Sequence, residues 1–290
     1  VLGTTACGKS GLGVELAKRF DGEIVSADSR QVYKGLDLGT GKVTEEEMEG
    51  VPHHMLDVVE PNQPYSVADF QAGAYAAIDD ILARGRTPFL AGGTGLYVRA
   101  VTEGFTFTDA RPDPALRAEL EGKTTEELYA LLREKTGVTL TGGEENNRHR
   151  LMRSVEKALS GRWESPPPCP RYDCLLLGVT FPREEVCRRI DVRLQARIDA
   201  GMLDEVADLR ANGATDAFLE GLGLEYRYIL RYLTGQIPTL DGLKDELGRA
   251  IKRFAKRQMV WFKKDRDVLW LDMEGDFLTQ AVRAVEGFLA

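Results

Sequence analysis

The sequence predicts an α/β fold in which helices flank a parallel sheet, with a small helical insertion in the middle of the chain. Three observations support this: a glycine-rich phosphate-binding pattern near the start, β-prone and helical segments alternating over the first hundred residues, and a change of character near Asp109. Alternation of strand and helix is typical of parallel sheets, because each crossover helix packs on a face of the sheet.

The first predicted element is a phosphate-binding loop, which makes the predicted core P-loop NTPase-like. The pattern G-x-x-x-x-G-K-[ST] is filled by Gly3, Thr4, Thr5, Ala6, Cys7, Gly8, Lys9 and Ser10. In this pattern inward-facing backbone N–H groups surround phosphate oxygens, the Lys adds a positive charge, and the Ser hydroxyl binds Mg²⁺. Because only Val1 and Leu2 precede the loop, we expect that a few residues of the natural chain come before Val1.

A helix is predicted directly after this loop, over residues 11–20. Leu12, Leu16 and Phe20 recur every four residues, as on one face of a helix. Its N-terminal end carries a partial positive charge, so it also favours an anion at the loop.

Two further strands are predicted to end near the loop. Residues 23–27 form a β-prone run followed by Asp28, and residues 87–91 form another that opens into Gly93 and Thr94. Between them Ser66 is predicted to cap a helix that continues to Arg84. Ligands of open α/β sheets bind beyond the carboxyl ends of the strands, so we expect these segments and the phosphate loop to converge on one crevice.

The chain is predicted to form a core from residues 1–108 and 171–290, interrupted by a helical insertion over residues 109–170. Within the insertion we expect helices near 115–121, 125–135 and 146–159. The returning core is predicted to add a strand within 173–181, helices over 183–212, 219–234 and 240–264, a strand over 268–271 and a closing helix.

Charge is distributed unevenly. The net charge of −8 argues against a protein coated in basic residues for indiscriminate nucleic-acid binding, and no apolar run approaches the roughly 18 residues of a membrane span. The four cysteines form neither a disulfide framework nor a paired zinc pattern, so a reducing cytoplasm is expected. One segment is strongly basic, the basic stripe, which consists of Arg249, Lys252, Arg253, Lys256, Arg257, Lys263, Lys264 and Arg266.

The phosphate loop alone would also suit an ATP-binding kinase or NTPase. Hydrolysing NTPases usually place an Asp on Mg²⁺ at the end of an apolar strand, whereas residues 87–91 end in glycines. Asp28 is better placed to accept a proton from an attacking group. Its alternative role is to cap the backbone or to lie in the second coordination shell of Mg²⁺. His53 and His54 are interpreted as structural, since the sequence offers no further His or Cys close to them.

Several sequence blocks resemble the tRNA dimethylallyltransferase family, also called tRNA isopentenyltransferases. The blocks run nearly end to end: residues 3–10, 28–35 (DSRQVYKG), 52–57 (PHHMLD), 65–70 (YSVADF), 92–97 (GGTGLY), and 255–258 (AKRQ) with Trp261 and Phe262. The resemblance implies transfer of a dimethylallyl group from dimethylallyl diphosphate to N6 of adenosine 37, next to the tRNA anticodon.

The resemblance also implies roles for particular residues. The phosphate loop would hold the diphosphate of the donor with Mg²⁺ on Ser10, Asp28 would act as general base, and Thr94 and Arg193 would contact the diphosphate. The target adenosine must leave the anticodon stack, as for other base-flipping enzymes. The tRNA contacts carried over are Asp28, Ser29, Arg30, Gln31, Thr94, Arg117, His149, Arg150, Arg153, Lys256, Arg257 and Gln258.

The sequence departs from the family pattern at some positions. Thr4 replaces the usual Pro, and the Gly-Tyr dipeptide of the family appears as Gly223-Leu224, followed by Glu225-Tyr226. Trp261 is interpreted as a core residue rather than a base-stacking one. Three alternatives stay open: an adenylate isopentenyltransferase acting on free AMP, a small-molecule kinase with ATP in the loop, and a non-catalytic nucleic-acid-binding module. The expected partners are the tRNA anticodon stem-loop and dimethylallyl diphosphate, and the expected state is a monomer.

Overall fold

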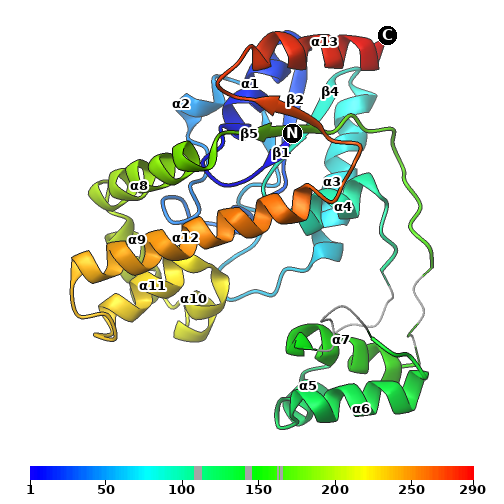
Figure 1. Cartoon of the computed structure of the whole chain (residues 1–290), viewed down its shortest axis with the longest axis vertical. Helices are drawn as coiled ribbons and strands as arrows, with labels where there is room; N and C mark the ends of the chain where they lie inside the picture. The colour runs from blue at the N-terminus through cyan, green and yellow to red at the C-terminus, as the bar shows by residue number, and fades with distance from the viewer. Residues whose placement is uncertain (108–112, 141–145, 162, 164–165) are drawn as a thin grey trace. The chain divides into compact units, whose positions relative to one another are not determined.

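The computed structural model describes residues 1–107, 113–140, 146–161, 163 and 166–290, and it divides into two compact units (Figure 1). The larger unit comprises Val1–Thr102 and Arg171–Ala290, and the smaller unit comprises Glu103–Pro170. The boundary predicted at Asp109 lies outside the described residues.

The larger unit alternates strands and helices before its helical C-terminal half. Its elements are β1 Leu2–Gly3, α1 Lys9–Arg19, β2 Gly22–Ser26, α2 Glu45–Met48, β3 His53–His54, α3 Val67–Ala83, β4 Thr87–Ala91, α4 Gly95–Thr102, β5 Leu177–Thr180, α8 Arg183–Asp199, α9 Met202–Ala211, α10 Asp216–Leu222, α11 Leu224–Leu233, α12 Leu240–Phe262, β6 Leu269–Asp272 and α13 Phe277–Leu289. The smaller unit contains α5 Pro114–Glu121, α6 Thr125–Thr136 and α7 Arg148–Leu159.

All paired strands are parallel, as predicted. β2 lies between β3 and β4, and β5 lies between β1 and β6. A parallel bridge between Leu2 and Gly92, with a hydrogen bond of 3.1 Å from the Gly92 N–H to the Val1 carbonyl, joins β1 to the end of β4. The strands therefore follow the order β3-β2-β4-β1-β5-β6, which puts the ends of β1, β2 and β4 side by side.

Apolar side chains cover both faces of the sheet. Successive residues of a strand point to opposite faces, and Ile24 and Val25 accordingly belong to different clusters. The Ile24 cluster includes Leu16 of α1, and the Val25 cluster includes Phe70 of α3. Helices on both faces hold the sheet rigid, and its loop ends remain available for a binding site.

Three details differ from the sequence prediction. The single helix predicted over 183–212 is wrong, because the backbone turns at Gly201 (φ +97°), a left-handed conformation that glycine adopts readily, and separates α8 from α9. The helix predicted over 219–234 is likewise divided at Gly223, whose extended backbone separates α10 from α11. β3 is an additional strand, two residues long, which is too short for a recognisable pattern.

The smaller unit has its own apolar core, which includes Leu120, Leu128 and Leu151. Beside this core Glu156, only 2% exposed in its side chain, accepts hydrogen bonds from Arg117 Nε at 2.9 Å and from Arg153 Nη1 at 3.1 Å. The Arg117 contact joins α5 to α7, whereas the Arg153 contact lies within α7.

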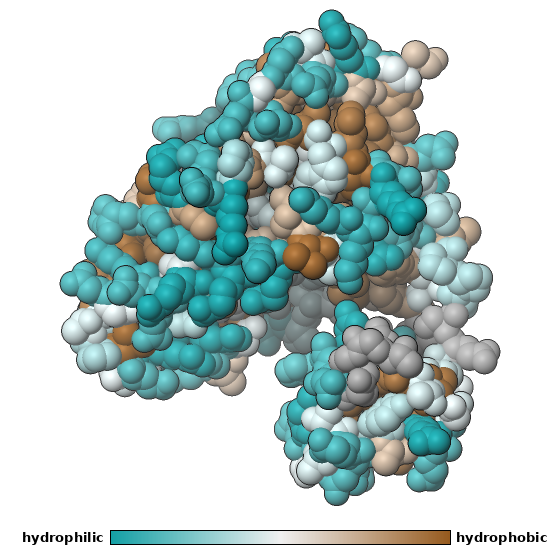
Figure 2. All heavy atoms as spheres, viewed as in Figure 1, coloured by the Kyte–Doolittle hydropathy of each residue, from teal (hydrophilic) through white to brown (hydrophobic). Residues whose placement is uncertain are grey.

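Polar residues dominate much of the surface. On the face seen in Figure 2, hydrophilic residues cover the larger unit over α12, which carries most of the basic stripe. Of the helices in the described part of the chain, none is long and apolar enough to cross a membrane.

Candidate active site

The phosphate loop connects β1 to α1. Gly8 has φ +80°, the left-handed conformation in which glycine carries no steric penalty, and the helix starts at Lys9. Lys9 Nζ donates to the Thr4 carbonyl at 2.6 Å, which folds the side chain back over the loop. Burial lowers the pKa of Lys9 to about 8, with the thiol of Cys7 acting in the opposite direction. A buried ammonium in a loop of backbone N–H groups favours an anionic ligand.

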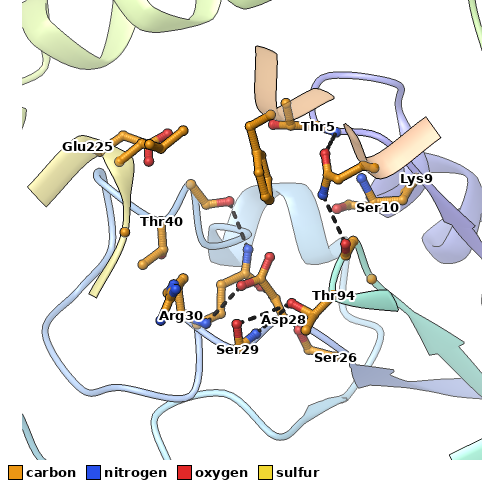
Figure 3. Close-up of a pocket in the computed structure, with 18 of the residues that line it drawn as sticks. Thr5, Lys9, Ser10, Ser26, Asp28, Ser29, Arg30, Thr40, Thr94 and Glu225 are labelled. Atoms are coloured by element: carbon orange, nitrogen blue, oxygen red, sulfur yellow. Dashed lines mark hydrogen bonds between the residues drawn. The ribbon is translucent and has the colours of Figure 1, made fainter. Parts of the chain in front are cut away.

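Asp28 follows β2, and Thr94 follows β4. Asp28 Oδ1 accepts a hydrogen bond of 2.9 Å from the Arg30 N–H, which fixes one carboxylate oxygen. Thr94 Oγ1 accepts from the Ser29 N–H at 3.0 Å and also lies 3.3 Å from Ser29 Oγ. The ends of the two strands are therefore tied to each other directly beside Asp28 (Figure 3).

Gln258 of α12 connects the phosphate loop to the turn after β4. Its Oε1 accepts from the Thr5 N–H at 3.0 Å, and its Nε2 donates to the Gly93 carbonyl at 2.9 Å. On the other side of the loop Arg189 Nε donates to the Ala6 carbonyl at 2.8 Å. The two long helices α8 and α12 thus both hold the phosphate loop. The sequence pattern did not reveal this role for Gln258.

Gln31 and Arg193 meet at one carbonyl oxygen. Gln31 Nε2 donates to the Gly41 carbonyl at 3.2 Å, and Arg193 Nη2 donates to the same oxygen at 3.3 Å. The amide oxygen of Gln31 in turn accepts from Ser26 Oγ at 3.1 Å. Loss of solvent around its guanidinium, followed by the charge of Arg197, lowers the pKa of Arg193 to about 10.

Lys9, Asp28, Thr94 and Arg193 line one cavity of about 550 Å³. Figure 3 shows Lys9 and Ser10 on one side of it, Asp28 and Thr94 near the centre, and Glu225 on the other side. The convergence predicted for the three strand ends therefore holds. The predicted site residues on its wall are Thr5, Lys9, Ser10, Asp28, Ser29, Arg30, Gln31, Thr94, Arg193, Arg257 and Gln258.

Three charged residues on this wall were not predicted: Arg197, Glu225 and Arg227. Arg197, one turn beyond Arg193 on α8, lies 3.8 Å from a carboxylate oxygen of Glu225. Burial raises the pKa of Glu225, and the charge of Arg197 opposes that shift. The spacing of four residues between Arg193 and Arg197 was a usable signal for Arg197, because it places both on one helix face.

Trp261 and Phe262 of α12 belong to both the core and the cavity wall. Phe262 is buried and Trp261 packs, partly buried, against the same apolar cluster, as predicted, but both also line the cavity. The Arg99 guanidinium lies 5.4 Å from the Trp261 ring centroid. A side chain at Gly95 would lie 2.3 Å from the Trp261 ring, so the ring occupies the space that this glycine leaves.

The two histidines face different surroundings. His53 Nδ1 lies 2.8 Å from the Val51 carbonyl, and His54 Nε2 lies 2.6 Å from Glu23, a carboxylate that also binds Arg84 and Arg86. Among the described residues no cluster of three or more His, Cys, Asp or Glu side chains is arranged to hold a metal ion.

The remaining predicted tRNA contacts are not among the residues that line this cavity. Lys256 is exposed on α12. Four others belong to the smaller unit: Arg117, His149, Arg150 and Arg153.

The fold and the cavity define a phosphate-loop α/β protein with a pocket beside the loop. Comparison with known families narrows this class. Family models described as IPP transferase and Isopentenyl transferase match residues 31–265 and 1–60, respectively. The chain belongs to the IPP transferase family.

Similar proteins extend over nearly the whole chain. The tRNA dimethylallyltransferase of Oceanobacillus iheyensis is 38% identical, over 100% of this chain and 95% of the relative, and tRNA dimethylallyltransferase 2 of Shewanella sediminis is 42% identical, over 97% and 95%. A solved tRNA isopentenylpyrophosphate transferase from Bacillus halodurans superposes with a TM-score of 0.74 at 37% identity, covering 99% of this chain and 93% of that one. A eukaryotic dimethylallyltransferase acting on tRNA superposes with a TM-score of 0.81 at 25% identity, covering 99% and 78%.

Proposed function

We propose that this protein transfers a dimethylallyl group from dimethylallyl diphosphate to N6 of adenosine 37, beside the anticodon of tRNA, and releases diphosphate. The observation that carries the proposal is the shared cavity, in which the phosphate loop and the carboxylate of Asp28, at the end of β2, face one space. Relatives named tRNA dimethylallyltransferase, similar over almost the full chain, support it.

The phosphate loop is proposed to hold the diphosphate of the donor. As the C1–O bond of the prenyl group breaks, negative charge accumulates on the leaving diphosphate, and Lys9, Arg193 and the N-terminus of α1 are proposed to stabilise it. Interactions that strengthen as this charge develops accelerate the reaction rather than only binding the substrate.

Asp28 is proposed as the general base. The exocyclic N6 amine of adenine is a weak nucleophile, so a positioned carboxylate that takes its proton as the N6–C1 bond forms accelerates transfer. The hydrogen bond from the Arg30 N–H to Oδ1 holds this carboxylate in place. Gln31 and Ser29, next to Asp28, are the side chains proposed to contact the acceptor nucleotide.

The oxygen ligands available at this site suit a Mg²⁺ ion that is bound mainly by the phosphates of the substrate. Ser10 offers a hydroxyl at the start of α1, and Mg²⁺ commonly combines few protein oxygens with substrate phosphate oxygens. When bound, Mg²⁺ neutralises charge on the diphosphate. Ser10 is the residue proposed to hold it.

The tRNA is proposed to contact the basic stripe and the arginines of the smaller unit. Phosphate contacts of Lys and Arg fix the position of a nucleic acid, while contacts to the bases specify the sequence. A mononucleotide acceptor has no use for an extended basic helix face, so free AMP is the less favoured acceptor.

A single assay separates these acceptors. Labelled dimethylallyl diphosphate and Mg²⁺ are offered with an anticodon stem-loop carrying adenosine 37, with the same stem-loop carrying guanosine 37, or with AMP. Label should enter only the adenosine stem-loop, and D28N should lower the rate about 10³-fold while stem-loop affinity stays within twofold. Labelling of AMP alone, or consumption of ATP without prenyl transfer, would overturn the proposal.

A further inference from the structure

Glu205 of α9 holds the backbone of a loop that reaches the active site. Its Oε2 accepts from the Asp37 N–H at 3.0 Å and the Leu38 N–H at 2.6 Å, and its Oε1 accepts from the Gly39 N–H at 3.0 Å. Tyr226 donates its hydroxyl to the same Oε1 at 2.7 Å. One carboxylate therefore binds three successive backbone N–H groups and a buried phenol.

Residues 37–41, here called the strap, have little freedom in this position. A side chain at Gly39 would lie 2.5 Å from Cζ of the Tyr226 ring, and Tyr226 is itself almost fully buried. The strap is further closed by a hydrogen bond from the Gly41 N–H to the Leu38 carbonyl at 3.1 Å, and Gly41 has φ +60°, in the left-handed region.

The end of the strap touches the active site. The Gly41 carbonyl is the shared acceptor for Gln31 Nε2 and Arg193 Nη2. Movement of this oxygen would shift both side chains that donate hydrogen bonds to it: Gln31, beside Asp28, and Arg193, on the cavity wall. Displacement of a reacting group by about 1 Å is enough to lower a rate by about 10²-fold.

We propose that Glu205, together with Tyr226, is a positioning residue of the transfer reaction: it fixes the strap so that the Gly41 carbonyl aligns Gln31 with the acceptor and Arg193 with the diphosphate. This inference rests on the proposed function. Glu205 is not among the residues that line the cavity, so it acts through the strap and not by touching substrate. Tyr226 does line the cavity, and its part in the positioning is the hydrogen bond from its hydroxyl to Glu205.

The carboxylate is required for a geometric reason. Glu205 accepts on both oxygens, whereas Gln has one acceptor oxygen and an NH₂ group that only donates. In E205Q an NH₂ group would face either Gly39 or the Asp37–Leu38 pair, so at least one backbone N–H would lose its acceptor. Y226F is the milder change, since it removes a single hydroxyl and keeps the ring that packs on Gly39.

The test compares E205Q and Y226F with D216N, which removes an exposed carboxylate bound to Arg210 in the same region without touching the strap. Using full-length protein, kcat and the KM values for dimethylallyl diphosphate and for the stem-loop are measured. We expect E205Q to lower kcat at least about tenfold and to raise the donor KM severalfold, Y226F to lower kcat about threefold, and D216N to stay within twofold of the wild type.

A double-mutant cycle separates positioning from stability. If the strap acts through Gln31, E205Q and Q31A combined should lose much less than the product of their separate losses, because the second change removes a contact that the first has already misaligned. Losses that multiply, or an E205Q enzyme with wild-type kcat and KM, would overturn the inference. If E205Q does not fold, Y226F serves as the test, and wild-type kinetics of Y226F would overturn the inference. A wild-type enzyme that labels no stem-loop would instead refute the proposed function.

Discussion

The Thr94 hydroxyl accepts a hydrogen bond from the Ser29 backbone N–H at 3.0 Å, and so joins the end of β4 to the residue that follows Asp28. β2 and β4 are paired over their whole length, but their pairing stops at Ser26 and Ala91. Beyond that point the connection continues through backbone hydrogen bonds from the Ala27 N–H to the Ala91 carbonyl at 2.8 Å and from the Thr94 N–H to the Ala27 carbonyl at 3.2 Å. The Thr94 side chain extends it to Ser29. The general base proposed here is therefore held in part by a residue of the neighbouring strand.

Replacement of Thr94 by Val should lower kcat about 10- to 100-fold, because the Ser29 N–H loses its acceptor and Asp28 shifts from its productive position. Val matches Thr in shape, so packing is retained. Single-turnover transfer to the stem-loop measures the effect. T94S keeps the hydroxyl and should recover most of the rate; equal rates for T94V and T94S would show that the hydroxyl plays no part.

The affinity for the donor should depend on pH through Lys9. Its pKa of about 8 means that the free protein loses this positive charge as pH rises above 8, so binding of dimethylallyl diphosphate should weaken by up to about tenfold per pH unit above that value. Calorimetric titration between pH 7 and 9.5 measures this. In K9R the charge persists over the whole range, so binding should be weaker but flat with pH.

The lowered pKa of Lys9 affects stability in the direction opposite to its effect on donor affinity. Between pH 8 and 10.5 the unfolded chain keeps Lys9 protonated while the folded protein releases the proton, so the contribution of Lys9 to the free energy of unfolding rises with pH in this window. A donor dissociation constant that is independent of pH in the wild type would contradict the proposed role of Lys9.

Sequence reasoning succeeded where chemistry is encoded locally. The phosphate loop is one continuous motif, and the parallel arrangement of strands follows from their order along the chain, which together predicted that Lys9, Asp28 and Thr94 lie close together. The resemblance to tRNA dimethylallyltransferases was confirmed by the family models and relatives.

Other contacts left no local signal. Asp37 and Glu205 are 168 residues apart, and Thr5 and Gln258 are 253 apart, so their hydrogen bonds depend on how α9 and α12 pack and not on any short motif. The helix breaks at Gly201 and Gly223 were missed because an isolated glycine within a helical pattern is often tolerated. Gln258 illustrates the limit, since the resemblance implied a contact with tRNA while its amide bridges two loops of the protein.

Glu23 is a buried carboxylate whose replacement should destabilise the protein. It is 2% exposed, and Arg86 Nη1 and His54 Nε2 contact it at 2.5 and 2.6 Å. Hydrogen bonds from Arg84 first, with further ones from His54 and Arg86, hold the pKa of Glu23 well below its usual range, against the effect of burial. E23Q should therefore lower the free energy of unfolding by about 3 kcal/mol, measured by urea denaturation.

The pH dependence of this effect has a defined direction. Because the folded pKa is depressed, the stability that Glu23 contributes is present above the unfolded value of 4.5 and is lost as pH falls below it. The difference between wild type and E23Q should thus shrink in acid. D80N, which removes the exposed partner of Arg84, should change stability by less than about 0.5 kcal/mol. Equal effects of E23Q and D80N would show that burial of the cluster is unimportant.

Arg257 tests whether the basic stripe contacts the tRNA backbone. It is exposed on α12, with its guanidinium 5.8 Å from the Phe254 ring centroid, so R257A removes a charge without opening the core. If Arg257 neutralises one phosphate, R257A should weaken stem-loop binding at low salt and reduce the slope of log K against log salt by about one. R210A removes an exposed arginine that is already paired with Asp216, and its salt slope should equal that of the wild type. Identical slopes for R257A and the wild type would mean that the tRNA backbone does not reach this part of α12.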